Sequence, residues 1–139
     1  MAKSISYTPD WEALSQAAKH AQNRAYAPYS LYRVGAAALG DDGQTYIGCN
    51  VENASYGLSM CAERSAVFQA VLGGAHAINA VVLYTDGATP ATPCGACRQV
   101  ISEFATDCTV LCISRDGDRI MTTVRELLPH AFGPHTLPR

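Results

Sequence analysis

The amino-acid sequence predicts an α/β fold, in which helices are layered on a sheet of about five strands. The first observation behind this is that segments with helical apolar spacing alternate with short apolar segments of strand length. The second is that the first two strand-like segments flank an Asp-Asp-Gly turn, which predicts a hairpin at the start of the sheet. The third is that 139 residues, 48% apolar and 16% charged, are typical of one compact domain. We therefore expect residues 1–139 to form a single domain.

The first predicted helix begins near Thr8, which can cap a helix that has Pro9 at its first position. Its apolar face is marked at helical spacing by Trp11, Leu14, Ala18, Ala21 and Ala25. Three further helices are predicted. Two of them begin at a cysteine, the first of these ends at a pair of glycines, and the last helix ends before Pro129. They cover residues 61–74, 94–105 and 124–128.

Five apolar segments of strand length lie between these helices, each bounded by turn residues. They cover residues 33–40, 44–51, 77–85, 108–115 and 119–124. The last two are separated by an Asp-Gly-Asp turn.

Composition and charge exclude several classes of protein. The net charge of −2 and the absence of a Lys/Arg run argue against a protein that mainly binds a nucleic-acid backbone. No apolar stretch approaches the roughly 20 residues of a membrane span. The N-terminal stretch MAKSISYTPDWEA lacks the apolar core of a signal peptide, so we expect a cytoplasmic protein. In that compartment the six cysteines are expected to be free thiols or metal ligands, not disulfides.

Three cysteines stand at the predicted starts of two helices and form a candidate metal site. Cys61 opens one helix, and Cys94 and Cys97 lie in the first turn of another. A helix N-terminus carries partial positive charge and unpaired N–H groups, which favour the thiolate that binds zinc. Three protein ligands leave the fourth tetrahedral position open, as in catalytic zinc sites.

Two further residues, Glu63 and Arg64, follow Cys61 on the same predicted helix and add to this pattern. Glu63 follows Cys61 by two positions, where a carboxylate can take a proton from water at the metal and return it to a substrate atom. Arg64 follows by three positions on the same helical face, where it can donate to the thiolates and temper their charge.

Each feature alone has an ordinary interpretation. A Cys-x-x-Cys pair can be a redox dithiol or half of a structural zinc site, and a lone glutamate on a helix is usually solvated. The combination is more specific, because Cys61-Ala62-Glu63-Arg64 is followed by the Pro-Cys-Gly-Ala-Cys segment that begins at Pro93, in which Cys94 lies 33 positions after Cys61. This spacing matches the signature of zinc deaminases, with cysteine as the first ligand in place of histidine.

The whole chain resembles the small, homotetrameric cytidine deaminases that have three cysteine ligands. The resemblance runs from AYAPYSLYRVGAAA through GCNVENASYG, MCAERSAVF and PCGACRQVISE to RELLPHAFG, in the family's order. It implies a mixed five-stranded sheet between helices, one Zn²⁺ per subunit, and a homotetramer with active sites at subunit interfaces. It also implies pyrimidine salvage by deamination of cytidine and deoxycytidine, with no nucleic-acid or membrane partner.

The resemblance also assigns roles to individual residues. It makes Glu63 the proton shuttle, and Asn50 and Glu52 the pair that binds the ribose 3′-hydroxyl. Alone, the Asn-Val-Glu-Asn stretch would indicate a polar strand end. The zinc ligands are Cys61, Cys94 and Cys97, and the remaining residues expected at the substrate or at subunit contacts are Tyr29, Tyr32, Tyr56, Ala62 and Phe132. Tyr32 departs from the family, which usually has phenylalanine there.

Several alternatives remain open at this point. A related deaminase of the blasticidin type would share the fold, although the expected ribose contacts argue against it. A thioredoxin-like enzyme would use Cys94 and Cys97 as a dithiol and leave Glu63 without a role. A nucleic-acid editor would require a basic groove. A structural zinc module would require a fourth ligand from among Cys49, His20, His76, His130 and His135.

Overall fold

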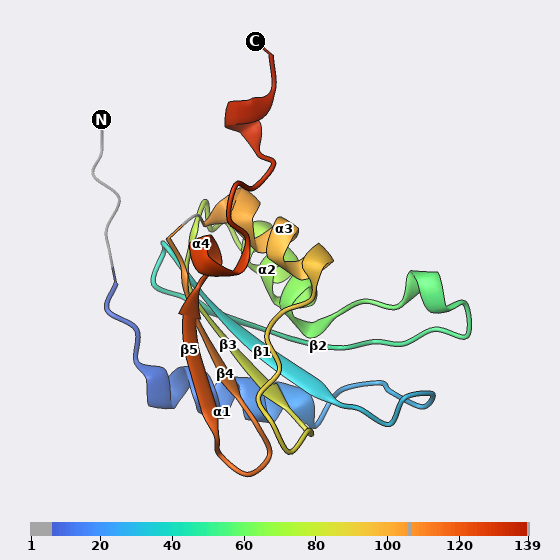
Figure 1. Ribbon diagram of the computed structural model, residues 1–139. Coiled ribbons are helices and arrows are strands. Elements are labelled where there is room, and N and C mark those ends of the chain that lie inside the picture. Colours follow the sequence, from blue (N-terminus) through green and yellow to red (C-terminus); the bar gives the residue numbers. More distant parts are fainter. Residues whose placement is uncertain (1–6, 106, 139) are drawn as a thin grey trace.

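Figure 1 shows a computed structural model of the chain, which describes residues 7–105 and 107–138. Part of the N-terminal stretch used to predict a cytoplasmic protein, residues 1–6, lies outside the described residues. The helices are α1 (Trp11–Gln22), α2 (Ala62–Leu72), α3 (Gly95–Phe104) and α4 (Val124–Leu127). The strands are β1 (Val34–Gly40), β2 (Thr45–Cys49), β3 (Ile78–Thr85), β4 (Thr109–Ile113) and β5 (Arg119–Thr123). The predicted α/β class and the order of its elements are confirmed.

The strands form one sheet in the order β2-β1-β3-β4-β5. Strands β3 and β4 pair in parallel, and the other neighbours pair antiparallel, so the sheet is mixed as expected. A parallel pair needs a crossover connection, and α3 lies in the connection between β3 and β4. The connection from β3 runs through Asp86 to Cys94, the N-cap of α3, and Cys97 lies in the first turn of that helix.

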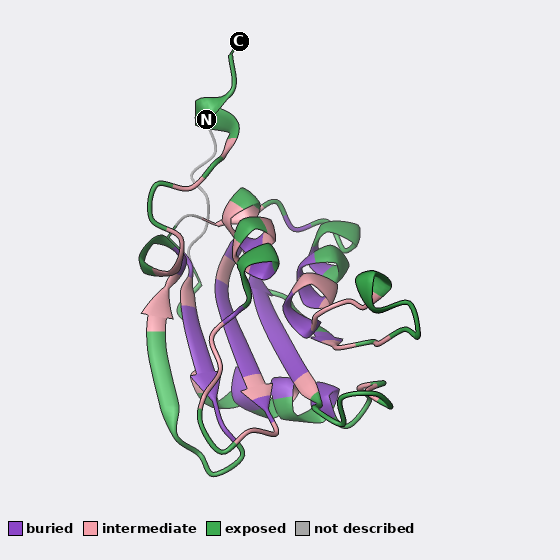
Figure 2. Cartoon of the chain, turned by 45° about the vertical axis from the view of Figure 1, so that its right-hand side comes forward, coloured by how far each residue is buried: buried purple, intermediate pink, exposed green. Residues whose placement is uncertain are grey.

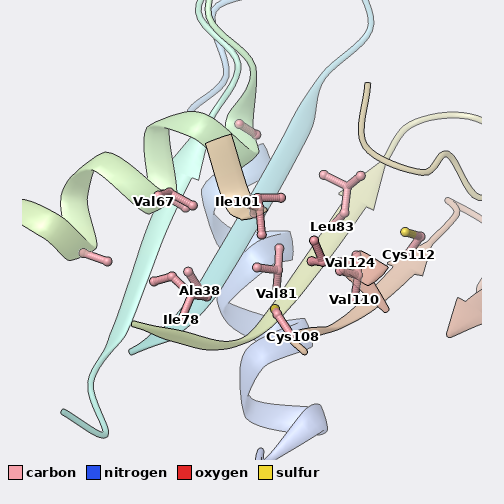
Figure 3. Packing of buried hydrophobic residues seen from close by; sticks show 14 of the residues in the cluster. Ala38, Val67, Ile78, Val81, Leu83, Ile101, Cys108, Val110, Cys112 and Val124 are labelled. Carbon is pink, nitrogen blue, oxygen red and sulfur yellow. The ribbon is translucent and has the colours of Figure 1, made fainter. Parts of the chain in front are cut away.

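Helices cover both faces of the sheet (Figures 1 and 2). On one face, Leu14 and Ala18 of α1 pack in a buried cluster with alternate residues of β1, β3 and β4. On the other face, Val67 of α2 and Ile101 of α3 pack over Val81 (Figure 3). The side chains of β3 point to opposite faces in turn, so one strand contributes to both layers. The predicted layering of the sheet between helices is therefore confirmed.

Small residues let the helices lie close to the first two strands. A Cβ atom added to Gly35 of β1 would lie 1.9 Å from the carbonyl oxygen of Ala18 in α1. A Cβ atom added to Gly48 of β2 would lie 2.4 Å from the backbone nitrogen of Ala66 in α2. Backbone atoms cannot move away without shifting a helix, so these two glycines fix how α1 and α2 sit on the sheet.

Helix α1 begins later than the sequence predicts. The Asp10 carboxylate accepts the backbone N–H of Ala13 at 3.1 Å, which makes Asp10 the N-cap in place of Thr8. Asp is as good a cap as Thr, and here it satisfies one of the free N–H groups of the first turn. The helix ends at Gln22, so Ala25 lies beyond it. No helix in the described parts of the chain is long and apolar enough to cross a membrane.

Candidate active site

The three candidate cysteines meet at the starts of two helices. Cys61 and Cys94 are the N-cap residues of α2 and α3, and Cys97 lies in the first turn of α3. The Sγ atom of Cys94 lies 3.9 Å from that of Cys61 and 3.4 Å from that of Cys97, and all three sulfurs lie within 4.8 Å of one another. Tetrahedral zinc with bonds of about 2.3 Å separates its sulfur ligands by about 3.8 Å. The donor atoms therefore fit one zinc ion.

No fourth ligand joins this cluster within residues 7–105 and 107–138. The three cysteines form the one group of three or more His, Cys, Asp or Glu residues there that could hold a metal ion. The histidines and Cys49, which a structural zinc module would require, do not contribute to it. Three ligands without a fourth are the arrangement of a catalytic site, where water or substrate completes the tetrahedron.

The cluster favours a thiolate at Cys61. Hydrogen bonding from Cys97 and from Arg64 lowers the pKa of Cys61 to about 5, against the opposing effect of burial. Hydrogen bonding to Cys61 and burial raise the pKa of Cys97. The two thiols thus share one proton, with Cys61 the first to ionise, and the cluster offers at least one thiolate to a metal at neutral pH.

Glu63 lies in the first turn of α2 and is buried, with 4% of its surface exposed. Burial raises the pKa of its carboxyl to about 7. A carboxyl with a pKa near the working pH can both accept and return a proton, which is what a general acid–base residue must do. Its position two residues beyond the N-cap Cys61 brings this carboxyl beside the cluster.

Arg64 reaches the cluster from the same turn. Its Nη2 atom donates to the Sγ atom of Cys61 at 3.4 Å. Its Nε atom is buried and has no hydrogen-bond partner among the described residues. The guanidinium cation can therefore offset part of the negative charge of three thiolates, which is the role that the sequence predicts for Arg64.

We expect Arg64→Gln to bind zinc about 10- to 100-fold more weakly and to slow turnover, because removing a group that supports metal ligands typically costs this much. Competition with a metallochromic chelator measures the affinity. The matched control is Arg119→Gln, which removes an exposed cation from β5. Zinc affinity equal to that of the control would show that Arg64 is only a structural cation.

A cavity of about 300 Å³ opens beside the cysteine cluster, within the size range of small-molecule sites. Six of the residues predicted from the sequence line it: Tyr32, Asn50, Glu52, Cys61, Ala62 and Glu63. Residues that the sequence did not single out complete the lining: Ser30, Val34, Ser59, Met60, Leu83, Thr85, Ala91 and Thr92. The cavity thus joins the cluster to the polar end of β2.

Asn50 uses its side-chain amide to hold one wall of this cavity. Its Oδ1 atom accepts the backbone N–H of Val34 at 2.8 Å, and its Nδ2 atom donates to the carbonyl oxygen of Tyr32 at 2.8 Å. One N–H and one lone pair remain for a ligand. Sequence reasoning predicted a ribose contact for this residue and missed its role in holding the backbone.

Glu52 holds the same wall at its outer end. Its Oε1 atom accepts the backbone N–H groups of Tyr29 at 3.0 Å and of Ser30 at 3.1 Å, and its Oε2 atom accepts the hydroxyl of Ser30. The hydrogen bond from the Ser30 hydroxyl lowers the pKa of Glu52, so the carboxyl stays ionised. Ser30 was not predicted, because a serine in a loop carries no signal of its own.

Tyr32 lies at the cavity with its ring beside Gly87, which follows β3. A Cβ atom added to Gly87 would lie 3.3 Å from the Tyr32 hydroxyl oxygen and 3.4 Å from its ring. The absence of a side chain at Gly87 therefore makes room for the hydroxyl that distinguishes this residue from phenylalanine.

Three predicted aromatic residues do not line the cavity of the single chain: Tyr29, Tyr56 and Phe132. Tyr56 is 74% exposed and makes an edge-on contact with Tyr29, with ring centroids 5.9 Å apart. Phe132 is 62% exposed on the C-terminal segment, where its carbonyl oxygen accepts a hydrogen bond from Gln99 at 2.9 Å. Tyr29 and Tyr56 instead line a neighbouring hollow, which shares Ser30, Glu52 and Ser59 with the cavity.

Comparison with known proteins agrees with this geometry. The model of the cytidine and deoxycytidylate deaminase zinc-binding region matches residues 9–113, a range that includes all three cysteines. The chain belongs to this family of zinc-binding deaminases. Its zinc cofactor, expected from the sequence, is therefore confirmed, and the three-cysteine group is the site that holds it.

Individual members of the deaminase family match over nearly the whole chain. The cytidine deaminase of Sporosarcina psychrophila is 46% identical over 92% of this chain and 95% of its own length. The cytidine deaminase of Mycobacterium tuberculosis is 41% identical over 94% and 95%. The crystal structure of the cytidine deaminase from Burkholderia pseudomallei superposes with a TM-score of 0.84 at 46% identity, covering 87% of this chain and 98% of that one. The deaminase fold predicted from the sequence is therefore confirmed.

Proposed function

We propose that residues 1–139 form one domain that hydrolyses cytidine and 2′-deoxycytidine to uridine and 2′-deoxyuridine, with release of ammonia, in pyrimidine salvage. The observation that carries this proposal is a three-cysteine zinc site and a buried carboxyl of near-neutral pKa beside one small-molecule cavity. The cytidine deaminases that resemble the chain over most of its length support it.

The chemistry divides between the metal and Glu63. When bound by Cys61, Cys94 and Cys97, zinc makes water acidic enough to serve as a nucleophile at neutral pH. Glu63 accepts the proton that this water gives up and passes it to N3 of the cytosine ring, which makes C4 electrophilic. After attack at C4, Glu63 accepts the proton of the hydroxyl group newly bound to C4 and delivers it to the departing amine, so that C4 is left as a carbonyl and ammonia is released. Its burial keeps bulk water away from these transfers.

The remaining cavity residues bind the nucleoside in this proposal. Asn50 and Glu52 contact the ribose 3′-hydroxyl with the donors and acceptors that do not bond to residues 29–34. Tyr32 stacks on the base. Ala62 is fully buried, so it contributes its backbone N–H, which has no intrahelical partner in the first turn of α2. No residue is assigned to the 2′-hydroxyl, so we expect both nucleosides to be substrates.

We also propose that the active enzyme is a homotetramer with one zinc per subunit. Tyr56, Leu58, Phe68, Leu72 and Phe132 are large apolar side chains that the single chain leaves exposed. Exposed apolar surface of this kind is typical of a face that binds another protein. In such an assembly Tyr56 and Phe132 can reach a neighbour's cavity, which matches the roles that the sequence predicts for them.

A panel of substrates tests the proposed function. The purified protein, with its zinc content measured, is incubated with cytidine, deoxycytidine, blasticidin S and a cytosine-containing single-stranded oligonucleotide, and ammonia release is followed. Turnover of the two free nucleosides alone, with one zinc per chain, supports the proposal. Turnover confined to the antibiotic or to the oligonucleotide would assign the site to a different deaminase reaction.

We expect Phe132→Ala to lower kcat/KM for cytidine by about 5- to 150-fold, since stacking of an aromatic ring on a base contributes roughly 1–3 kcal/mol. A chain truncated after Pro129 should show the stronger defect and keep its zinc, because all three cysteines remain. Steady-state kinetics measure the loss, and sedimentation reports the assembly. The matched control is Leu137→Ala, another exposed apolar residue of the same segment. A truncated chain with native kcat/KM would show that this segment takes no part in catalysis.

A further inference from the structure

Residues 29–34 form one wall of the cavity, and residues 29–33 belong to no helix or strand. This wall supplies Ser30, Tyr32 and Val34 to the cavity, and only Val34 belongs to a strand. Leu31 within it has a left-handed backbone conformation, with φ of 59°. A segment of this kind keeps its shape only where other groups satisfy its backbone polar atoms.

Asn50 and Glu52 satisfy part of this wall, as described above, and a second pair satisfies Arg33. The Nε2 atom of Gln22 donates to the carbonyl oxygen of Arg33 at 3.1 Å and to Oδ1 of Asp86 at 2.9 Å. Oδ2 of Asp86 accepts the backbone N–H of Arg33 at 3.3 Å and its side-chain Nε–H at 3.2 Å. Both backbone polar groups of Arg33 are thus held by the Gln22–Asp86 pair.

Gln22 and Asp86 belong to two regular elements next to this wall, α1 and the end of β3. Gln22 is the last residue of α1 and is 4% exposed, and Asp86 directly follows β3. Neither residue lines the cavity, whereas the two neighbours of Arg33 in sequence, Tyr32 and Val34, both do. A shift of the Arg33 peptide would therefore move both of these cavity residues without touching the cysteine cluster.

We propose that Gln22 and Asp86 are positioning residues, which fix the Arg33 peptide and through it the placement of Tyr32 against the substrate. The inference rests on the proposed function, because it assigns Tyr32 to the base of a nucleoside. The pair acts on substrate binding, not on the proton transfers of Glu63 or on the zinc site, which belong to α2 and α3. Its loss should therefore appear in KM and leave kcat and zinc content close to those of the wild type.

The first test removes the carboxylate. Asp86→Ala is expected to raise KM for cytidine about 10-fold, as the loss of a charge-assisted hydrogen bond typically does, with kcat changed by less than about 2-fold. Asp86→Asn keeps the size of the side chain and serves as a second variant if Asp86→Ala does not fold. The matched control is Asp107→Ala, which breaks an exposed ion pair with Arg125 at 2.7 Å and should leave KM unchanged.

The second test reverses the polarity of the pair. Gln22→Glu alone would place two carboxylates in contact and should raise KM as Asp86→Ala does. In the double variant Gln22→Glu with Asp86→Asn, the new amide can donate to Glu at position 22 and still accept from Arg33. The Arg33 carbonyl oxygen then loses its donor and faces a carboxylate oxygen, so the double variant should recover only part of the lost affinity.

The outcomes separate this inference from the proposed function. Partial recovery of KM in the double variant, with zinc content and thermal unfolding measured beside it, supports the positioning role. KM values equal to that of the wild type in all variants would overturn the positioning role. Losses in kcat and stability that the double variant does not reverse would also overturn it. Neither result would affect the proposed function, provided that the wild type turns over cytidine. A wild-type chain that turns over no nucleoside would overturn both.

Discussion

Glu63→Gln is expected to keep its zinc and to lose cytidine turnover by about 10²- to 10⁴-fold, the usual contribution of a general acid–base residue. The amide has almost the same shape as the buried carboxyl, so the cavity and the cysteine cluster should remain intact. It cannot accept a proton from water or return one to the ring and the amine, so each proton transfer loses its carrier. Steady-state kinetics measure the loss, and zinc content is determined on the same sample.

The matched control is Glu103→Gln, which makes the same chemical change at an exposed position of α3. We expect its kcat and zinc content to equal those of the wild type. A zinc-loaded Glu63→Gln enzyme with wild-type kcat would show that another group carries the protons, and the mechanism proposed for Glu63 would be wrong.

Cys97→Ala should release zinc and abolish turnover. A zinc site with its full ligand set binds with roughly 10–16 kcal/mol, so one thiolate contributes about 3–4 kcal/mol, or 10²- to 10³-fold in affinity. The remaining pair, Cys61 and Cys94, would leave two positions of the tetrahedron to solvent. Metal analysis after dialysis against a weak chelator measures the effect.

Cys108→Ala provides the control for this variant, because it removes a buried sulfur that is not part of the cluster. It creates a comparable small cavity in the core and should lower stability, yet we expect it to keep one zinc per chain. Equal zinc retention by Cys97→Ala and Cys108→Ala would remove Cys97 from the ligand set.

The metal centre could be predicted from the sequence because local rules fix its parts. Cys61 and Cys94 each stand directly before a segment with helical features, and both become N-caps, although neither side chain accepts a backbone N–H of its helix. Glu63 and Arg64 then follow in the first turn of the helix that Cys61 opens. The elements were predictable for the same reason, since alternation and turn residues act over a few positions.

The cavity wall could not be predicted, because its partners come from distant parts of the chain. Gln22 and Asp86 are 64 residues apart in sequence, and neither has a neighbour that marks it as functional. The placement of the α1 cap failed for a different reason, since Thr8 and Asp10 are both good caps and only the packing of the helix decides between them. The roles proposed for Tyr56 and Phe132 involve a neighbouring chain of the proposed homotetramer, which local patterns of one sequence do not describe.

The order of the elements bears on what a bound metal does for the fold. The helices that begin directly after Cys61 and directly after Cys94 lie on either side of β3 in sequence. The three sulfurs lie together in the folded chain, so zinc binding should stabilise the folded state by mass action. The metal of this site is therefore also a cross-link between the starts of α2 and α3.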